Sequence, residues 1–450
     1  VFTDEFLAAL TGINFEAVRF MPFVGANDVE PEYPAVTEWS QRKLIDDASQ
    51  APINAIGKRG AASWDLVIDL VNLVSMDPWI CIPVSATAEY VESLARLLLD
   101  SLDPSLNIYI ESSNEVWNSI FPQQAYNLAQ ANDLGIGEQE NHARRTVELA
   151  QIFQGVFGAG SLNNRVRAIL ASHDPMLRWW VEPMLEYIRQ NIGEPSDYLY
   201  GISSQAYFTM PMQEGQSVED ILAEARDSIT TSIDETGGVD EAGRMQWVAT
   251  AEAWSLPGGY FIYEGGGHPT LGSLENIDNV ITAERDSGMG ELLKYNYGPG
   301  FLDAGGRLAM HFILSSAYTR YGSFGLTDDI AYPDRNYKYG ALRELAGEGV
   351  SVDDRNIRHN QLFIKAPGVI AGRSDISFSV PGPGSKARLS IHDCRGIQVK
   401  LLWKGTSQSG SQQVSWDGTD TSGRHLSPGV YIMSLQSGSS RTSTPVVMMP

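Results

Sequence analysis

Cysteine is scarce in this chain, with only Cys81 and Cys394 among 450 residues. Two cysteines so far apart in sequence provide neither a disulfide framework nor a local zinc knuckle. The seven histidines are dispersed and no His-Glu-x-x-His pattern occurs, so the sequence predicts no metal site. No apolar run reaches the ~18–20 residues that span a bilayer, and we expect no membrane span.

Basic residues are in the minority: 32 Lys and Arg stand against 55 Asp and Glu, a formal net charge of −23. A surface of that sign repels phosphate groups, which argues against nucleic acid as a partner. No Gly-x-Ser-x-Gly elbow, Gly-x-Gly-x-x-Gly loop or P-loop occurs, which argues against an α/β-type serine hydrolase and a nucleotide cofactor. The 43% hydrophobic content is that of a folded globular protein.

Charge is unevenly distributed along the chain. Residues 363–450 carry a net charge of +5 and residues 1–362 a net charge of −28. The C-terminal part is rich in Ser and Gly, and short β-type runs alternate there with turn residues, a pattern typical of a small β-sandwich. We therefore predict a first domain over residues 1–345, a linker over 346–362 and an all-β sandwich over 363–450.

The first part alternates between helix-type and strand-type segments. Two amphipathic helices, one with Val67 and Val74 on its apolar face and one with Val91 and Leu98, flank the apolar run 79–84. Such alternation predicts an α/β fold with a parallel sheet, as in a (β/α)8 TIM barrel. Strands are predicted at 18–21, 79–84, 107–112, 166–172, 198–207, 260–263 and 312–318. A closed barrel needs one more, and because residues 1–14 indicate a helix and a turn, we expect the first strand upstream of Val1.

Two glutamates follow predicted strands. Glu115 ends the run 108–115, and Glu264 ends the run 260–264. A barrel brings the carboxyl ends of its strands to one rim, and two facing carboxylates are the groups that glycoside hydrolysis requires. Glu252, which also follows an apolar segment, is an alternative nucleophile, although residues 245–254 indicate a helix.

The residues around these glutamates resemble a known family. Asn114-Glu115 is similar to the Asn-Glu signature of clan A (β/α)8 glycoside hydrolases, and the resemblance covers nearly all of residues 1–345. It implies that Glu115 is the acid/base, that Asn114 holds the sugar 2-hydroxyl and that Glu264 is the nucleophile. Arg19 resembles the arginine that positions this nucleophile. The resemblance also implies retention of anomeric configuration and no cofactor.

Other positions match the family less well. Tyr207 resembles the aromatic residue that contacts the nucleophile, but Gln205 stands where a nearby His is usual. Ser85 likewise follows the third barrel strand in place of a His, and we predict that it binds substrate. Tryptophan rings offer large apolar area for stacking on sugars, and Trp117 and Trp79 are the candidates among the supporting residues.

One further candidate follows the nucleophile. His268 comes after three glycines that follow Glu264. It is expected to contact substrate or to orient Glu264, and the alternative that it is an ordinary loop residue stays open.

The C-terminal part carries a resemblance of its own. The stretch 416–420, with the Pro-Gly-Val-Tyr of residues 428–431, is similar to the immunoglobulin-like module of the flagellar hook-cap protein. This module occurs at the C-termini of many secreted bacterial enzymes, so the resemblance implies export or cell-surface attachment.

Together these patterns predict a secreted or cell-surface bacterial protein that we expect to be a monomer. The expected activity is a retaining glycoside hydrolase that cleaves a β-linked polysaccharide, with endo action on cellulose or a related β-glucan preferred. The alternative is a non-catalytic carbohydrate-binding or adhesion protein on a degenerate barrel.

Overall fold

The computed structural model describes most of the chain, in two compact units, Val1–Gly349 and Val350–Pro450. The described residues are 2–27, 38–50, 62–173, 176–210, 213–234, 243–269, 275–347, 363–365, 369–370, 373–380, 385–393, 395–406, 412–438 and 440–449. Most of the predicted linker, residues 348–362, therefore lies outside the described part.

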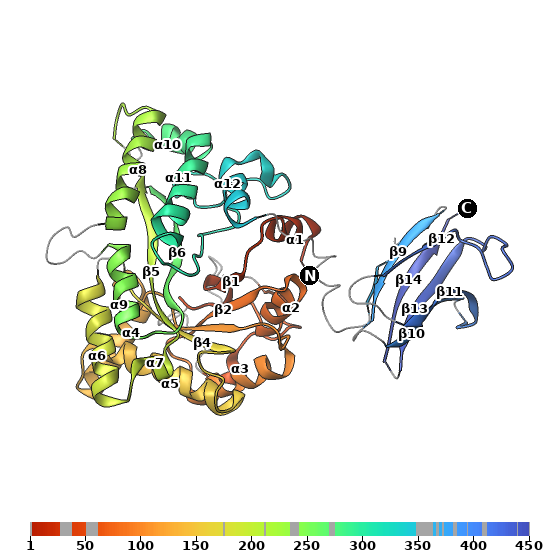
Figure 1. Ribbon diagram of the computed structural model, residues 1–450, viewed down its shortest axis with the longest axis horizontal. Coiled ribbons are helices and arrows are strands. Elements are labelled where there is room, and N and C mark those ends of the chain that lie inside the picture. The colour runs from red at the N-terminus through yellow and green to blue at the C-terminus, as the bar shows by residue number, and fades with distance from the viewer. Residues whose placement is uncertain are drawn as a thin grey trace. The chain divides into compact units, whose positions relative to one another are not determined.

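The first unit contains a parallel six-stranded sheet in chain order, β1-β2-β3-β4-β5-β6. Its strands are β1 (Ala17–Phe20), β2 (Asp77–Ile82), β3 (Ile108–Ser112), β4 (Val166–Ala171), β5 (Gly201–Met210) and β6 (Gly259–Pro269). The sheet is curled like half of a barrel, with helices along its outer side (Figure 1). This order is that of consecutive βα units, as the alternation of the sequence predicts.

The helices of this unit lie before, between and after the strands. They are α1 (Asp4–Thr11), α2 (Trp64–Val74), α3 (Ala88–Ser101), α4 (Pro122–Leu134), α5 (Glu138–Phe157), α6 (Glu182–Asn191), α7 (Pro195–Tyr198), α8 (Val218–Asp234), α9 (Arg244–Ala253), α10 (Ile277–Glu284), α11 (Ser287–Tyr297) and α12 (Tyr337–Ala346). Side chains of Ser63 and Thr87 cap α2 and α3 by accepting bonds from backbone N–H groups in the first turn. The predicted apolar faces of both helices are buried.

The segment after α11 takes the place of a seventh strand. The amide of Ile262 donates to Leu308 O at 3.0 Å, and the amide of Met310 donates to Ile262 O at 2.9 Å, so residues 308–310 run parallel to β6. The predicted strand 312–318 is wrong in position. Beyond Phe312 the backbone pairs with residues 326–327 instead, and the apolar run there packs against that stretch.

The second unit is all-β. Its five-stranded sheet has the order β11-β10-β13-β14-β8, and its three-stranded sheet the order β12-β9-β7. The core between them contains Trp416, Leu389 and Met433. The strands are β7 (Phe363–Lys365), β8 (Val369–Ile370), β9 (Ser374–Ser379), β10 (Lys386–His392), β11 (Gln398–Thr406), β12 (Gln412–Trp416), β13 (Gly429–Ser437) and β14 (Ser440–Met448). The predicted class, an α/β barrel-type unit followed by an all-β sandwich, is confirmed.

Candidate active site

The carboxyl ends of several parallel strands bring polar side chains together at one edge of the sheet. Arg19 comes from β1, Glu111 from β3, Tyr207 from β5 and Glu264 from β6, while Glu115 lies in the turn after β3. Because consecutive strands run in the same direction, residues far apart in sequence meet at this edge. All five lie in one network of hydrogen bonds and charges.

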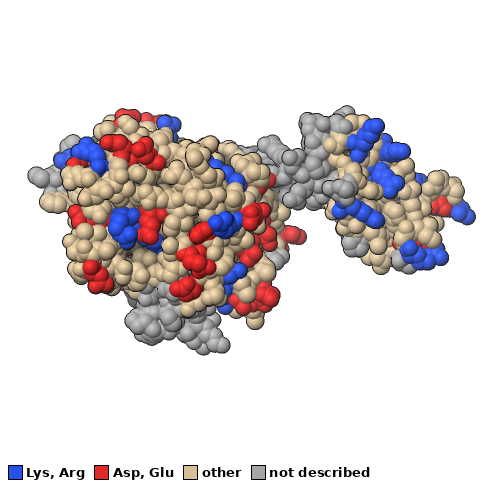
Figure 2. Space-filling view, turned by 90° about the horizontal axis from the view of Figure 1, so that it is seen from below, with Lys and Arg blue, Asp and Glu red and all other residues tan. Residues whose placement is uncertain are grey.

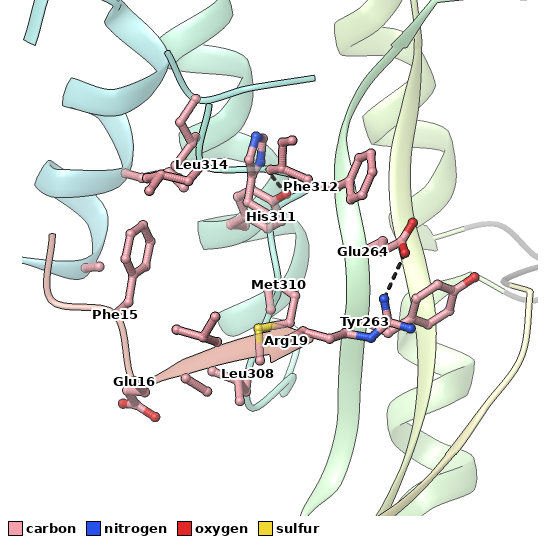
Figure 3. A pocket seen from close by; sticks show the side chains of 18 of the residues that line it. Phe15, Glu16, Arg19, Tyr263, Glu264, Leu308, Met310, His311, Phe312 and Leu314 are labelled. Atoms are coloured by element: carbon pink, nitrogen blue, oxygen red, sulfur yellow. Dashed lines mark hydrogen bonds and ion pairs between the residues drawn. The ribbon is translucent and has the colours of Figure 1, made fainter. Parts of the chain in front are cut away.

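Glu264 is buried, with 8% of its surface exposed. Arg19 Nη1 donates to its Oε1 at 2.8 Å (Figure 3), and the Tyr207 hydroxyl donates to its Oε2 at 2.9 Å. Burial raises the pKa of Glu264, Arg19 opposes that rise, and the negative charge of Glu115 adds to it. The two contacts hold both carboxylate oxygens in fixed directions.

Arg19 is itself fixed by Glu111, a residue that the sequence analysis did not single out. The guanidinium Nε donates to Glu111 Oε2 at 2.9 Å and Nη2 donates to Oε1 at 3.0 Å, a bidentate pair that is almost fully buried. Trp79 Nε1 also donates to Glu111 Oε2, at 2.7 Å. A glutamate inside the apolar run of β3 was the available signal, because a buried carboxylate needs such partners.

Glu115 has different surroundings. The Asn118 amide Nδ2 donates to its Oε2 at 2.8 Å, and the Tyr263 hydroxyl lies 3.1 Å from its Oε1. The same hydroxyl lies 2.8 Å from Gln205 Oε1, and its single proton can serve either acceptor. Glu115 is more exposed than Glu264 and has a left-handed backbone with φ 45°, a strained conformation of the kind found at functional sites.

Asn114 is buried beside Arg19. Its Oδ1 accepts from Arg19 Nη2 at 2.9 Å, and its Nδ2 donates to Asn27 Oδ1 at 3.2 Å. Gln123 Nε2 donates to the Asn114 carbonyl at 2.6 Å. Asn27, Gln123 and Asn118 thus belong to the site, although the sequence alone did not identify them.

The predicted stacking role is wrong for Trp79. Its surface is 0% exposed and its ring stacks on Tyr109 with centroids 5.6 Å apart, so a sugar cannot reach it. Trp79 instead supports Glu111. Trp117 is 8% exposed and contacts Tyr263 edge to face at 5.9 Å, and its buried indole N–H has no partner among the described residues.

The remaining candidates lie around this centre. Ser85 is buried, and its hydroxyl has no partner among the described residues; it lines a separate cavity of about 330 Å³ between the ends of β2 and β3 and helices α4 and α5. His268 belongs to β6, opposite Thr209, so it is not a loop residue, and its side chain lies outside the described part. Glu252 is exposed on α9, which removes it as a nucleophile.

A larger cavity of about 520 Å³ opens beside Arg19 and Glu264, between β1 and residues 308–314 (Figure 3). Its walls are mainly apolar and include Met310, Phe312 and Leu314. Apolar walls offer few hydrogen-bond partners, so the polar groups beside this cavity are concentrated around Glu264 and Arg19.

The described ranges also bear on metal sites and on membrane spans. Within these ranges, no three or more His, Cys, Asp or Glu side chains are grouped to hold a metal ion. None of the helices in the same ranges has the length and apolar character for crossing a membrane.

Comparison with known proteins finds one family model that matches part of the chain. Residues 368–441 match the FlgD Ig-like domain. The C-terminal unit is thus similar to the module that its motifs resemble. No curated protein sequence matches the chain significantly.

The solved structures that match most or part of the chain include a mannanase, FlgD and latent PorU. An endo-beta-1,4-mannanase double mutant from Cellulomonas fimi is 10% identical, with 86% of this chain and 80% of that chain covered and a TM-score of 0.36. FlgD from P. aeruginosa is 23% identical over 20% of this chain and 71% of its own, with a TM-score of 0.16. Latent PorU from Porphyromonas gingivalis is 18% identical over 19% of this chain, with a TM-score of 0.17, and the match spans only 9% of PorU.

Proposed function

We propose that the first unit is a retaining glycoside hydrolase that acts on a β-linked polysaccharide. The observation that carries this proposal is a pair of glutamates in contrasting environments at one edge of the sheet. Glu264 is buried between the Arg19 guanidinium and the Tyr207 hydroxyl, whereas Glu115 is more exposed and contacts neutral Asn118 and Tyr263. Two carboxyl groups with separated roles are what double displacement needs.

Glu264 serves as the nucleophile in this proposal. Its carboxylate oxygen attacks the anomeric carbon, a carbon–oxygen bond to the enzyme forms, and the bond to the leaving oxygen breaks. Arg19 and Tyr207 orient the carboxylate for this attack. The Arg19 charge also favours the ionised form of the buried carboxyl group, because it opposes the rise in pKa that burial causes.

Glu115 serves as the acid/base. It donates its proton to the leaving oxygen in the first step, and in the second step it removes a proton from the water that releases the sugar from Glu264. Its exposure suits this role, because both the leaving group and the water must reach it. Asn114, oriented by Arg19 and Asn27, is placed to bind a sugar hydroxyl more strongly in the transition state.

The decisive test uses Glu264→Ala with an activated aryl glycoside. We expect turnover to be abolished, and sodium azide to restore it with a glycosyl azide of inverted configuration, because azide fills the space of the missing carboxylate. Glu252→Ala, an exposed glutamate on α9, is the matched control and should retain wild-type activity. Unchanged turnover in Glu264→Ala would contradict the assignment.

Substrate choice is tested separately with cellulose, soluble β-glucan, xylan and β-mannan. The resemblance to clan A glycoside hydrolases favours endo action on cellulose or a related β-glucan, which predicts a rapid fall in viscosity before monosaccharide accumulates. Binding to one of these polymers without any product would instead support the non-catalytic alternative.

A further inference from the structure

The five-stranded sheet of the second unit contains no acidic residue. Its strands β8, β10, β11, β13 and β14 hold no Asp or Glu, yet they hold Lys386, Arg388, Lys400, Lys404 and Arg441. The aspartates of residues 363–450 lie in β9 of the other sheet or between strands, at 375, 393, 417 and 420. The net charge of +5 over residues 363–450 is therefore concentrated on one sheet.

Strand register places four of these cations on one face. Arg388 pairs with Lys404 on β11 and with Gln436 on β13, and Gln436 pairs with Arg441 on β14. Directly paired residues of antiparallel strands point to the same side, and Lys386, two residues before Arg388, shares that side. We call Lys386, Arg388, Lys404 and Arg441 the cationic face; all four are exposed.

The charges of the cationic face are not neutralised by neighbours. Arg388 donates to Gln436 Oε1 and Arg441 donates to Ser434 Oγ, each at 2.8 Å, and both acceptors are uncharged. No described carboxylate forms an ion pair with any of the four. By contrast, Arg395 pairs with Asp393 on a loop at 2.8 Å. Figure 2 shows more Lys and Arg than Asp and Glu on the visible side of this unit.

We propose that the cationic face binds an anionic polysaccharide whose sugars carry carboxylates. The row from Lys404 to Arg441 crosses four strands, or roughly 14 Å at about 4.8 Å per strand, which suits an extended polymer. Guanidinium groups bind carboxylates in a planar, two-bond geometry. The exposed hydroxyls of Thr406 and Ser443 share the face through their pairing with Lys386 and Ser434 and can bind sugar hydroxyls.

Other polyanions fit this surface less well. Single-stranded nucleic acids are held by aromatic rings that stack on bases, and no Phe, Tyr or Trp stands at an outward position of the paired rows. A flat sheet face also offers no protruding element to enter a duplex groove. The proposal does not depend on the hydrolase activity of the first unit.

The test measures binding of the full chain to immobilised polygalacturonate, with neutral glucomannan as the reference surface. Arg388→Gln/Lys404→Gln removes two charges from the cationic face, and Arg395→Gln/Arg424→Gln removes two from loops of the same unit. Net charge changes equally in both variants. We expect the first to weaken binding by at least about tenfold and the second to leave it within about twofold, with wild-type binding decreasing as salt increases.

Three results would overturn the proposal. The first is that the wild-type chain does not bind polygalacturonate at low salt. The second is that both double variants lose the same amount of binding affinity. The third is that duplex DNA or dextran sulfate, at equal charge, competes for binding as effectively as soluble polygalacturonate. Thermal unfolding of each variant checks its fold. Lys404→Gln alone repeats the test with the smallest change, because the exposed Lys404 side chain forms no hydrogen bond with the described residues. The experiment measures binding and not hydrolysis. Its result is therefore the same whether or not Glu264 is the nucleophile.

Discussion

At the scale of single residues, the site depends on one buried arginine with two acidic partners. Arg19 joins Glu111 to Glu264 and also holds Asn114. Removing one partner of a buried pair leaves an uncompensated charge, which is much more costly than loss of an exposed pair. Glu111 is therefore a positioning residue whose effect on Glu264 passes through Arg19.

We predict that Glu111→Gln lowers the free energy of unfolding by about 3–5 kcal/mol and lowers kcat by about 10²-fold with little change in KM. Glu92→Gln, which breaks an exposed pair with Arg96, is the control and should cost less than about 0.5 kcal/mol. Urea unfolding and steady-state kinetics measure the two effects. Equal stability and activity in the two variants would exclude a positioning role.

The pH profile tests the surroundings of Glu264. Burial raises its pKa, whereas the hydrogen bond from Tyr207 lowers it. Since the nucleophile must be ionised, the acidic limb of kcat/KM follows this pKa, and Tyr207→Phe should move the limb to higher pH by about one to two units. Exposed Tyr321→Phe should leave it in place. A shift to lower pH, or none, would show that Tyr207 does not stabilise the ionised form.

At the scale of elements, close packing between β5 and β6 limits which residues fit. A Cβ added to Gly201 would lie 2.5 Å from the Gly259 carbonyl oxygen and 2.5 Å from the Phe261 ring. A carbonyl of the neighbouring strand cannot move aside as a flexible side chain can. The small residue at the start of β5 therefore allows the two strands that carry Tyr207 and Glu264 to approach each other.

We predict that Gly201→Ala destabilises the first unit by about 1–3 kcal/mol. Gly155→Ala is the matched control, because Gly155 is an exposed residue of α5 with no atom near its added Cβ, and it should stabilise by about 0.5–1 kcal/mol. Thermal unfolding monitored by circular dichroism distinguishes the two. A change in stability of the same sign for both substitutions would contradict this account of the packing.

Element prediction from the sequence was accurate where periodicity is strong. Helices α2 and α3 and strand β2 agree with the apolar patterns that indicated them. The segment after α11 failed because Phe312, Ile313 and Leu314 form an apolar run that is typical of a strand, while the actual neighbour of β6 is the less apolar stretch 308–310. Which segment pairs with β6 is decided by contacts between residues that are distant in sequence, and a local apolar pattern does not show those contacts.

At the scale of the whole molecule, the two units carry opposite charge and separate surfaces. Every residue that we assign to the proposed active site lies in the unit Val1–Gly349, and the cationic face lies in Val350–Pro450. A chain ending at Gly349 should therefore keep kcat/KM on a soluble substrate within about twofold and lose binding to polygalacturonate. Loss of activity in a truncated chain that still unfolds cooperatively would show that the second unit contributes to catalysis.

The amino-acid sequence alone indicated the succession of elements, the division between an acidic and a basic part and the two candidate glutamates. These features depend on local periodicity and composition, which a single chain displays directly. Only the tertiary structure decided that Glu111 holds Arg19, that Trp79 is buried beneath the site and that four cations share one sheet face. Each of these depends on strand register and on contacts between residues distant along the chain, because burial and charge pairing are properties of the folded arrangement.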